Sequence, residues 1–134
     1  MTGKIMELAI NDALTKGINA QKNGEMVDAL RFYEKVLILQ PNHSTANHNA
    51  GVVCMDIGQG EAALPFLRNA LEVNPSVEQY WISYADALVK QGFFEDAEIV
   101  LKHAKKSGAR DEYLTSLSSA ISRLTFNDEI VSPN

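Results

Sequence analysis

A period of 34 residues runs through most of this chain and limits what it can fold into. Small residues and helix-ending residues recur at this spacing in four series: Ala29, Ala63 and Ala97; Gly24, Gly58 and Gly92; Gly17, Gly51 and Ala85; and Pro41 with Pro75. A fixed period in this range is the signature of a solenoid, in which neighbouring units stack and share a core. The period therefore predicts an array of repeated units.

Each unit is predicted to be a pair of helices joined by a tight turn. In the middle unit, Gly51 lies on the first helix, Gly58 marks the turn, Ala63 lies on the second helix and Pro75 ends the pair. Antiparallel helices approach closely only where their side chains are small, so we expect Gly51 and Ala63 to face each other. The predicted fold class is all-α, with repeats at about 10–43, 44–77 and 78–111.

Several local features follow from the same pattern. We expect helices over residues 3–23 and 26–39, and an N-cap at Ser44 or Thr45 for the middle unit. Ser76 and Gln79 have the spacing of a capping box that starts the third unit. The buried face of the first helix is predicted to hold six residues, which are Ile5, Leu8, Ala9, Ala13, Gly17 and Ala20.

The C-terminal part of the chain is predicted to be a capping helix over 112–124, with Asp111 as its N-cap. Its apolar side carries Leu114, Leu117, Ala120 and Ile121, and its other side is rich in serine. A polar outer face on the last helix keeps a solenoid from exposing its hydrophobic edge. We expect one domain over 1–125 and a flexible tail over 126–134, which shows no period.

Charge and composition exclude several functional classes. The net charge is −5, which argues against nucleic-acid binding, because phosphate contacts need a clustered positive field. No apolar run approaches the length of about 18 residues that a membrane span needs. Cys54 is the single cysteine and the N-terminus is a poor signal peptide, so we expect a cytoplasmic protein.

No set of residues has the spacing of a catalytic or metal site. His43 and His48 are five residues apart rather than the four of a helical metal pair, and Cys54 occupies a core position of its repeat. Gly58-Gln59-Gly60 lacks the lysine and hydroxyl of a phosphate-binding loop. We therefore expect no enzyme activity, no metal and no cofactor.

The repeat resembles the tetratricopeptide repeat, whose pattern is W-x2-L-G-x2-Y, then A-x3-F, then P. The third unit carries Trp81-x2-Tyr84-Ala85-x2-Leu88 and Ala97-x3-Leu101. The middle unit has Asn47 in place of the tryptophan. The resemblance implies a right-handed superhelical α-solenoid of three repeats and a capping helix, with the first helix of each pair lining a concave groove.

The resemblance also implies which residues line that groove and bind a peptide or protein partner. The first repeat contributes Asn11, Leu14, Thr15, Ile18 and Lys22. The second contributes Thr45, His48, Asn49, Val52, Met55 and Asp56. The third contributes Gln79, Ile82, Ser83, Asp86, Val89 and Lys90.

Amides and hydroxyls in this set can bind a peptide backbone, while the aliphatic residues contact its side chains. Some relatives clamp the terminal carboxylate of chaperone tails in this groove. Asn49 matches that arrangement, but Leu14, Ile18, Gln79 and Ser83 replace the family's clamp residues, so chaperone-tail binding is not expected.

Three hypotheses follow for the function. The first is a non-catalytic adaptor that binds a partner in the groove. The second is part of a larger transferase, because the run from Ile38 to Leu88 is similar to bacterial repeat modules that often precede glycosyltransferase, methyltransferase or sulfotransferase domains. The third is self-association, either through the uncovered face of residues 3–23 or through a displaced last helix.

Overall fold

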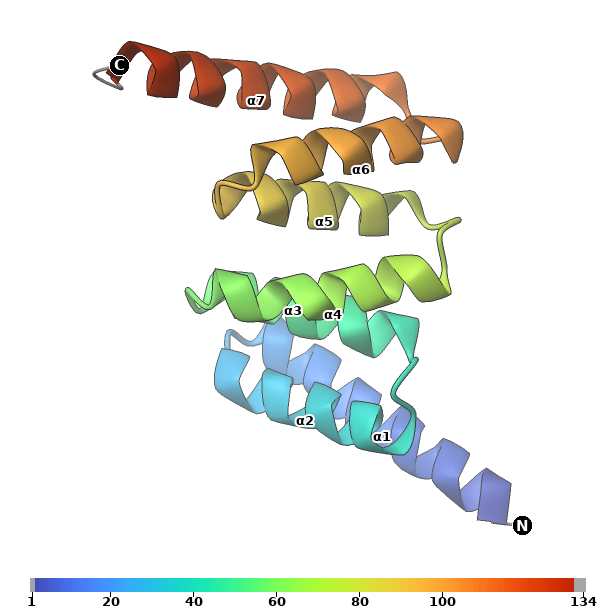
Figure 1. The fold of residues 1–134 in the computed structure, drawn as a ribbon. Helices are drawn as coiled ribbons and strands as arrows, with labels where there is room; N and C mark the ends of the chain where they lie inside the picture. Colours follow the sequence, from blue (N-terminus) through green and yellow to red (C-terminus); the bar gives the residue numbers. More distant parts are fainter. Residues whose placement is uncertain (1, 132–134) are drawn as a thin grey trace. The chain divides into compact units, whose positions relative to one another are not determined.

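The computed structural model describes residues 2–131, which form seven α-helices and no strand (Figure 1). The helices are α1 (Thr2–Lys22), α2 (Met26–Leu39), α3 (Ser44–Asp56), α4 (Gly60–Val73), α5 (Glu78–Lys90), α6 (Phe94–Lys106) and α7 (Asp111–Val131). The predicted all-α fold of helical hairpins is confirmed. The chain divides into two compact units, one ending at Asn74 and the other beginning at Pro75.

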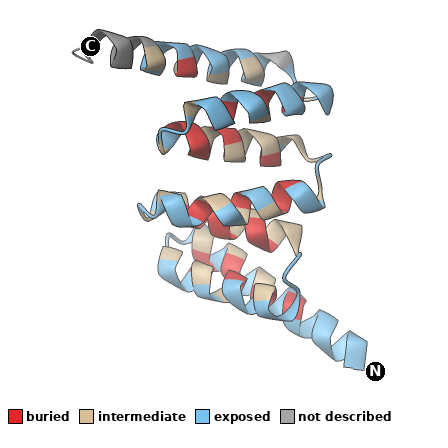
Figure 2. Ribbon diagram, in the orientation of Figure 1, coloured by how far each residue is buried: buried red, intermediate tan, exposed pale blue. Residues whose placement is uncertain are grey.

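The first unit holds two hairpins, α1 with α2 and α3 with α4, and α2 also packs against α3. Small and apolar side chains fill the space where α1, α2 and α3 meet. The stretches of these helices that carry buried residues are red in Figure 2. One cluster there consists of Ala20, Ala29, Tyr33, Ala50 and Val53, and a second consists of Ile10, Ala13, Val36 and Ala46.

Gly51 and Ala63 lie at the crossing of α3 and α4, as the sequence predicts. A Cβ atom placed on Gly51 would lie 2.5 Å from Cγ of Leu67 and 3.3 Å from the carbonyl oxygen of Ala63. Gly17 has the same role in the first hairpin, where a Cβ would lie 2.7 Å from the Tyr33 ring. Leu67 of α4 therefore packs directly on Gly51 of α3, and Tyr33 of α2 packs directly on Gly17 of α1.

The turn glycines have the left-handed backbone that their positions demand. Gly24, Gly58, Gly92 and Gly108 have φ angles between 78° and 94° and follow α1, α3, α5 and α6. The residue after each one donates its N–H to a carbonyl five residues earlier, as Gln59 does to Cys54 at 2.8 Å. These bonds satisfy carbonyls at the helix end, and glycine adopts the required conformation without strain.

The first two turns of α1 do not belong to the core, and here the predicted buried face is wrong. Ile5, Leu8 and Ala9 are exposed, whereas Ile10 is buried. The cause is length, because α1 has 21 residues and α2 has 14. The N-terminal turns of α1 therefore project past the end of α2, which leaves residues 2–9 exposed (Figure 1).

Two of the three N-cap predictions, those for α3 and α5, are also wrong. The N-cap of α3 is His43, whose Nδ1 accepts the N–H of Ala46 at 3.1 Å, so Ser44 is already inside the helix. The N-cap of α5 is Val77, whose side chain makes no cap hydrogen bond, so Ser76 lies one residue before the cap. Gln79 instead donates its side-chain N–H to the Ser83 hydroxyl at 3.1 Å, one turn further along α5.

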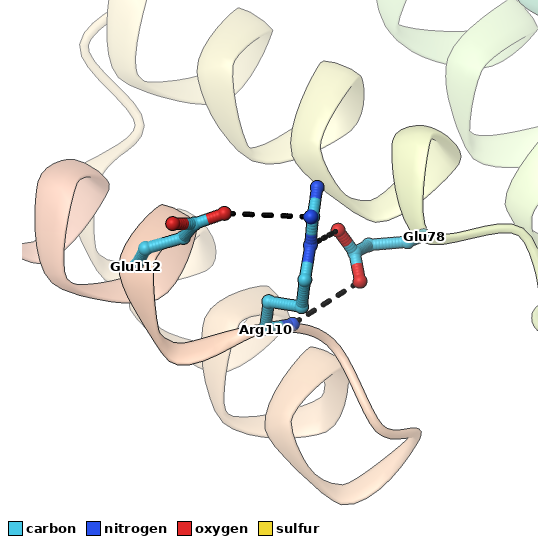
Figure 3. Close-up of polar contacts among 3 residues, drawn as sticks. All are labelled: Glu78, Arg110 and Glu112. Carbon is cyan, nitrogen blue, oxygen red and sulfur yellow. Dashed lines mark hydrogen bonds and ion pairs between the residues drawn. The ribbon is translucent and has the colours of Figure 1, made fainter.

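In the second unit, an ion pair joins the start of α5 to the segment before α7 (Figure 3). Nε of Arg110 lies 3.0 Å from Glu78 Oε1, and the backbone N–H of Arg110 donates to Glu78 Oε2 at 3.2 Å. Arg110 also lies 3.5 Å from Glu112 and stacks over the Tyr113 ring, 4.8 Å from its centroid. These contacts fix the point at which the chain leaves α6 and begins the last helix.

Helix α7 packs on α6 through its predicted apolar side. Ile121 is buried and Leu114, Leu117 and Ala120 are half-buried, while the serines of the opposite side are exposed. The helix reaches Val131, seven residues beyond the predicted end at 124, so it includes residues 126–131 of the predicted tail. No glycine or proline lies between Gly108 and Pro133 to interrupt it. The rest of the predicted tail and the side chain of Asp111 lie outside the described residues.

Candidate functional site

The predicted partner-binding residues of α1 lie along one side of that helix. Asn11, Thr15 and Lys22 are exposed, whereas Leu14 and Ile18 are half-buried against the core of the first unit. The polar residues are therefore free to meet a ligand, while the apolar pair is held in place by the packing beneath it. This arrangement gives α1 a fixed apolar strip bordered by polar groups.

The corresponding residues of α3 are more enclosed. Thr45, His48, Asn49, Val52 and Met55 are all half-buried, and Asp56 at the end of the helix is exposed. Half-burial leaves part of each side chain accessible and restricts its rotamers. Such side chains lose less conformational entropy on binding than fully mobile ones.

A chain of hydrogen bonds joins the three helices that make the core of the first unit. The Tyr33 hydroxyl on α2 donates a hydrogen bond to Oε1 of Gln21 on α1 at 2.5 Å. The same hydroxyl accepts a hydrogen bond from Nδ2 of Asn49 on α3 at 3.4 Å. Asn49 was predicted as a groove residue, but Gln21 and Tyr33 were not. The available signal was Tyr33 itself, because the other repeats have Leu67 and Leu101 at that position.

The Tyr33 and His48 side chains titrate in a partly dry environment. Burial raises the pKa of Tyr33, and the hydrogen bond from Asn49 opposes the shift. Burial also lowers the pKa of His48, while a hydrogen bond with Asn49 acts in the opposite direction. Both shifts favour the neutral form of the group, so this part of the surface is uncharged at neutral pH.

In the second unit, the predicted residues of α5 pair along the helix. Asp86 and Lys90 form an ion pair at 3.0 Å, and Gln79 is bonded to Ser83. Ile82 is half-buried, but Val89 is buried and is less suited to ligand contact than its neighbours. The accessible residues of the predicted set on α5 are therefore mostly polar.

The other candidate groups show no site chemistry. Cys54 is buried, and its burial raises the pKa of the thiol, with a further contribution from the negative charge of Glu34. A reactive cysteine needs the opposite shift. Among the side chains that the structure describes, no group of three or more His, Cys, Asp or Glu is placed to hold a metal ion. In the same part of the chain, none of the helices has the length and apolar character of a membrane span.

Comparison with known sequences identifies related repeats. A family model described as tetratricopeptide repeat matches residues 58–121. Photosystem I assembly protein Ycf3 from Synechococcus sp. (strain CC9605) is 35% identical over 63 residues, which are 45% of this chain and 36% of Ycf3. The chain spans between 10% and 36% of the length of the curated relatives that it matches.

Solved structures share the arrangement of helices. The TPR2B domain of yeast Sti1, solved in a complex with pHsp70, matches with a TM-score of 0.79 and 15% identity, over 87% of this chain and 98% of that domain. An O-GlcNAc transferase from Thermobaculum terrenum matches with a TM-score of 0.73 and 25% identity, over 87% of this chain and 22% of the transferase. The similarity to the yeast domain shows a common fold.

Proposed function

We propose that this chain, which belongs to the tetratricopeptide repeat family, is a non-catalytic interaction module that binds a peptide segment or a protein partner on its first helices, α1, α3 and α5. The name of the similar yeast structure describes a complex with another protein, which supports a role of this kind.

The observation that carries the proposal is the character of the first helices. Leu14 and Ile18 are half-buried side chains packed against the core, Val52 is half-buried on α3, and amides and hydroxyls lie beside them on the same helices. A bound peptide needs hydrogen bonds for its backbone and apolar contacts for its side chains, and this surface offers both. We expect a short segment to bind with micromolar affinity, about −8 kcal/mol.

Asn49 is the best-defined polar group of this surface. Its Nδ2 is held by the Tyr33 hydroxyl, which fixes the plane of the amide before any ligand arrives. A fixed amide costs less entropy to engage than a mobile one. We propose that Asn49 contacts the backbone of a partner on the first unit, and that Asp86 on α5 is a polar contact of the second unit.

The test uses peptides selected from a random library on the immobilised chain, with binding measured by fluorescence anisotropy of a labelled hit. Replacing Asn49 and Asp86 by alanine should weaken binding by at least about tenfold. The matched control removes Arg68 and Glu72, an exposed pair on α4, and should leave binding unchanged. A selected peptide that binds the first variant as well as the parent chain would contradict the proposal.

A second candidate function rests on the similarity to the O-GlcNAc transferase, which this chain matches over 22% of the transferase's length. We propose that, as part of a larger protein, the repeats would hold a protein substrate near a catalytic domain. Sequencing the native gene beyond residue 134 tests this: a transferase domain in frame supports it, and a stop codon removes it.

A further inference from the structure

We propose that two copies of this chain associate by exchanging the first two turns of α1, each copy placing its residues 2–9 in a groove of the other. Residues 2–9 are called the arm below. The proposal concerns the outer side of the first hairpin and is independent of the partner-binding surface on the first helices.

The groove lies between α1 and α2 and has a volume of about 390 Å³. Its apolar lining comes from both helices, and three charged side chains stand at its rim. The apolar residues are Ala9, Ala13, Phe32, Ile38 and Leu39, and the charged residues are Asp12, Lys16 and Lys35. Ile38 is 79% exposed, which leaves a large apolar side chain open to solvent beside the groove.

The arm has the shape and composition of a docking segment. All of residues 2–9 are exposed, and Ile5 and Leu8 are 68% and 60% exposed. These two residues are three positions apart on a helix, so they lie on the same face. The arm projects beyond α2, where a second molecule can reach it (Figure 1).

Exposed apolar side chains are concentrated at this one end of the hairpin. Of the eleven large hydrophobic residues exposed in the described part of the chain, five belong to the arm or the adjoining end of α2, and these are Ile5, Met6, Leu8, Ile38 and Leu39. Exposed apolar side chains gathered at one end of a hairpin are typical of an interaction site. Single exposed apolar residues elsewhere on the chain need no such explanation.

The charged residues of the groove argue against another repeat packing on α1 in the way that α2 packs on α3. Asp12 and Lys16, which form an ion pair at 3.1 Å, stand 34 residues before Ala46 and Ala50. Both alanines are buried where α2 packs on α3. A repeat stacked on α1 in that way would bury the ion pair, which is costly unless a partner supplies matching groups.

Charge complementarity favours a second copy of this chain as the occupant. The arm carries one charge of each sign, Lys4 and Glu7, on either side of Ile5. The groove of the other copy offers an ion-pair partner for each charge, because Asp12 can pair with Lys4 and Lys35 can pair with Glu7. The arm and the groove adjoin each other on one hairpin. In a two-fold dimer, the arm of each copy would therefore lie in the groove of the other, and no arm or groove would be left over to bind a third copy.

The first experiment measures the mass of the untagged full chain by sedimentation velocity from micromolar to near-millimolar concentration. We expect a shift from monomer to dimer. Leu8→Glu and Ile38→Glu should each raise the dissociation constant by at least about tenfold. Val27→Glu is the matched control, because Val27 is 57% exposed on α2 and does not line the groove, and it should leave the constant unchanged.

The second experiment exchanges charges. Glu7→Lys and Lys35→Glu should each weaken the dimer, and the chain that carries both changes should recover most of the lost affinity. A chain that stays monomeric at every concentration overturns the proposal and leaves the groove to a helix of another protein. A dimer that tolerates Leu8→Glu and Ile38→Glu, or whose double charge exchange gives no recovery, also overturns it.

Discussion

Asn47 and Trp81 occur at the same position of consecutive repeats and make the same hydrogen bond with different side chains. Asn47 Nδ2 donates to the carbonyl oxygen of Pro41 at 3.0 Å, and Trp81 Nε1 donates to that of Pro75 at 2.7 Å. In both cases the acceptor lies six residues earlier, at the loop that ends the preceding repeat. The sequence shows Asn47 as a departure from the repeat pattern, but the structure shows that its function is retained.

Asn47→Asp should destabilise the chain strongly. Asn47 is 1% exposed, and its amide nitrogen also donates to the carbonyl oxygen of His43 at 3.1 Å. A carboxylate has no N–H to donate and would face two carbonyl oxygens without water. An unsatisfied buried group costs about 1–3 kcal/mol, and a charged one costs more.

The measurement for Asn47→Asp is urea unfolding followed by circular dichroism. Trp81→Phe serves as the comparison, since the bond to Pro75 is exposed and water can replace the indole N–H. We expect a clearly smaller loss for Trp81→Phe than for Asn47→Asp. Equal losses of unfolding free energy would show that the buried hydrogen bonds of Asn47 stabilise the chain no more than the exposed bond of Trp81.

Gly51→Ala and Ala63→Leu should both overpack the crossing of α3 and α4. The added Cβ of Gly51→Ala would lie 2.5 Å from Leu67, which is 1% exposed and has little room to move. We expect each change to cost about 1–3 kcal/mol in the free energy of unfolding.

The control for these variants is Gly3→Ala, made in an exposed helical position with nothing within 4 Å of the added atom. Because alanine is a better helix former, this change should be neutral or stabilise by up to about 1 kcal/mol. An unchanged denaturation midpoint for Gly51→Ala would count against the close crossing.

Tyr33→Phe should remove the hydrogen bonds that link α1, α2 and α3 while keeping the ring in place. The loss of the hydroxyl frees both Gln21 and Asn49, and we expect a cost of about 0.5–1.5 kcal/mol. A double-mutant cycle with Asn49→Ala measures the coupling of the pair. If the two losses simply add, the link between Tyr33 and Asn49 contributes nothing to stability.

His48 should make the stability of the chain fall in mild acid. Burial lowers its pKa, so between the folded pKa and the ordinary value of 6.5 the unfolded chain binds more protons. The stabilising contribution is therefore complete above about pH 6.5 and is lost as the pH falls through the folded pKa.

His48→Gln should flatten this pH dependence in urea unfolding series between about pH 7.5 and pH 5, which bracket the ordinary pKa of histidine. His103→Gln, at an exposed histidine of α6, is the control and should follow the parent chain. A parent chain and His48→Gln variant with parallel pH profiles would assign the acid sensitivity to other groups.

The 34-residue period predicted the helical hairpins well because it reflects contacts that every repeat must make. Gly51 must be small since Leu67 packs on it, and Gly58 must be glycine because its φ angle is 81°. Such positions recur at a fixed spacing, so they can be recognised without coordinates. The end of α4 before Pro75 is equally visible, because the residue before proline disfavours the helix.

Features that depend on where a partner helix ends could not be predicted from the pattern. The apolar stripe of α1 continues through Ile5 and Leu8, but α2 is too short to cover these residues. Local hydrogen-bond choices were also hidden, since His43 competes successfully with Ser44 and Thr45 as N-cap. The link from Tyr33 to Asn49 joins different helices and has no signature in sequence spacing.

Nuclear magnetic resonance tests most directly whether a partner binds on the first helices. Backbone amide shifts of the labelled chain are recorded with and without a peptide selected from the random library. We predict that the largest changes fall on α1, α3 and α5, around residues such as Thr15, Asn49 and Ser83, with α2, α4 and α6 little affected. Changes concentrated on the second helices would contradict the proposed function.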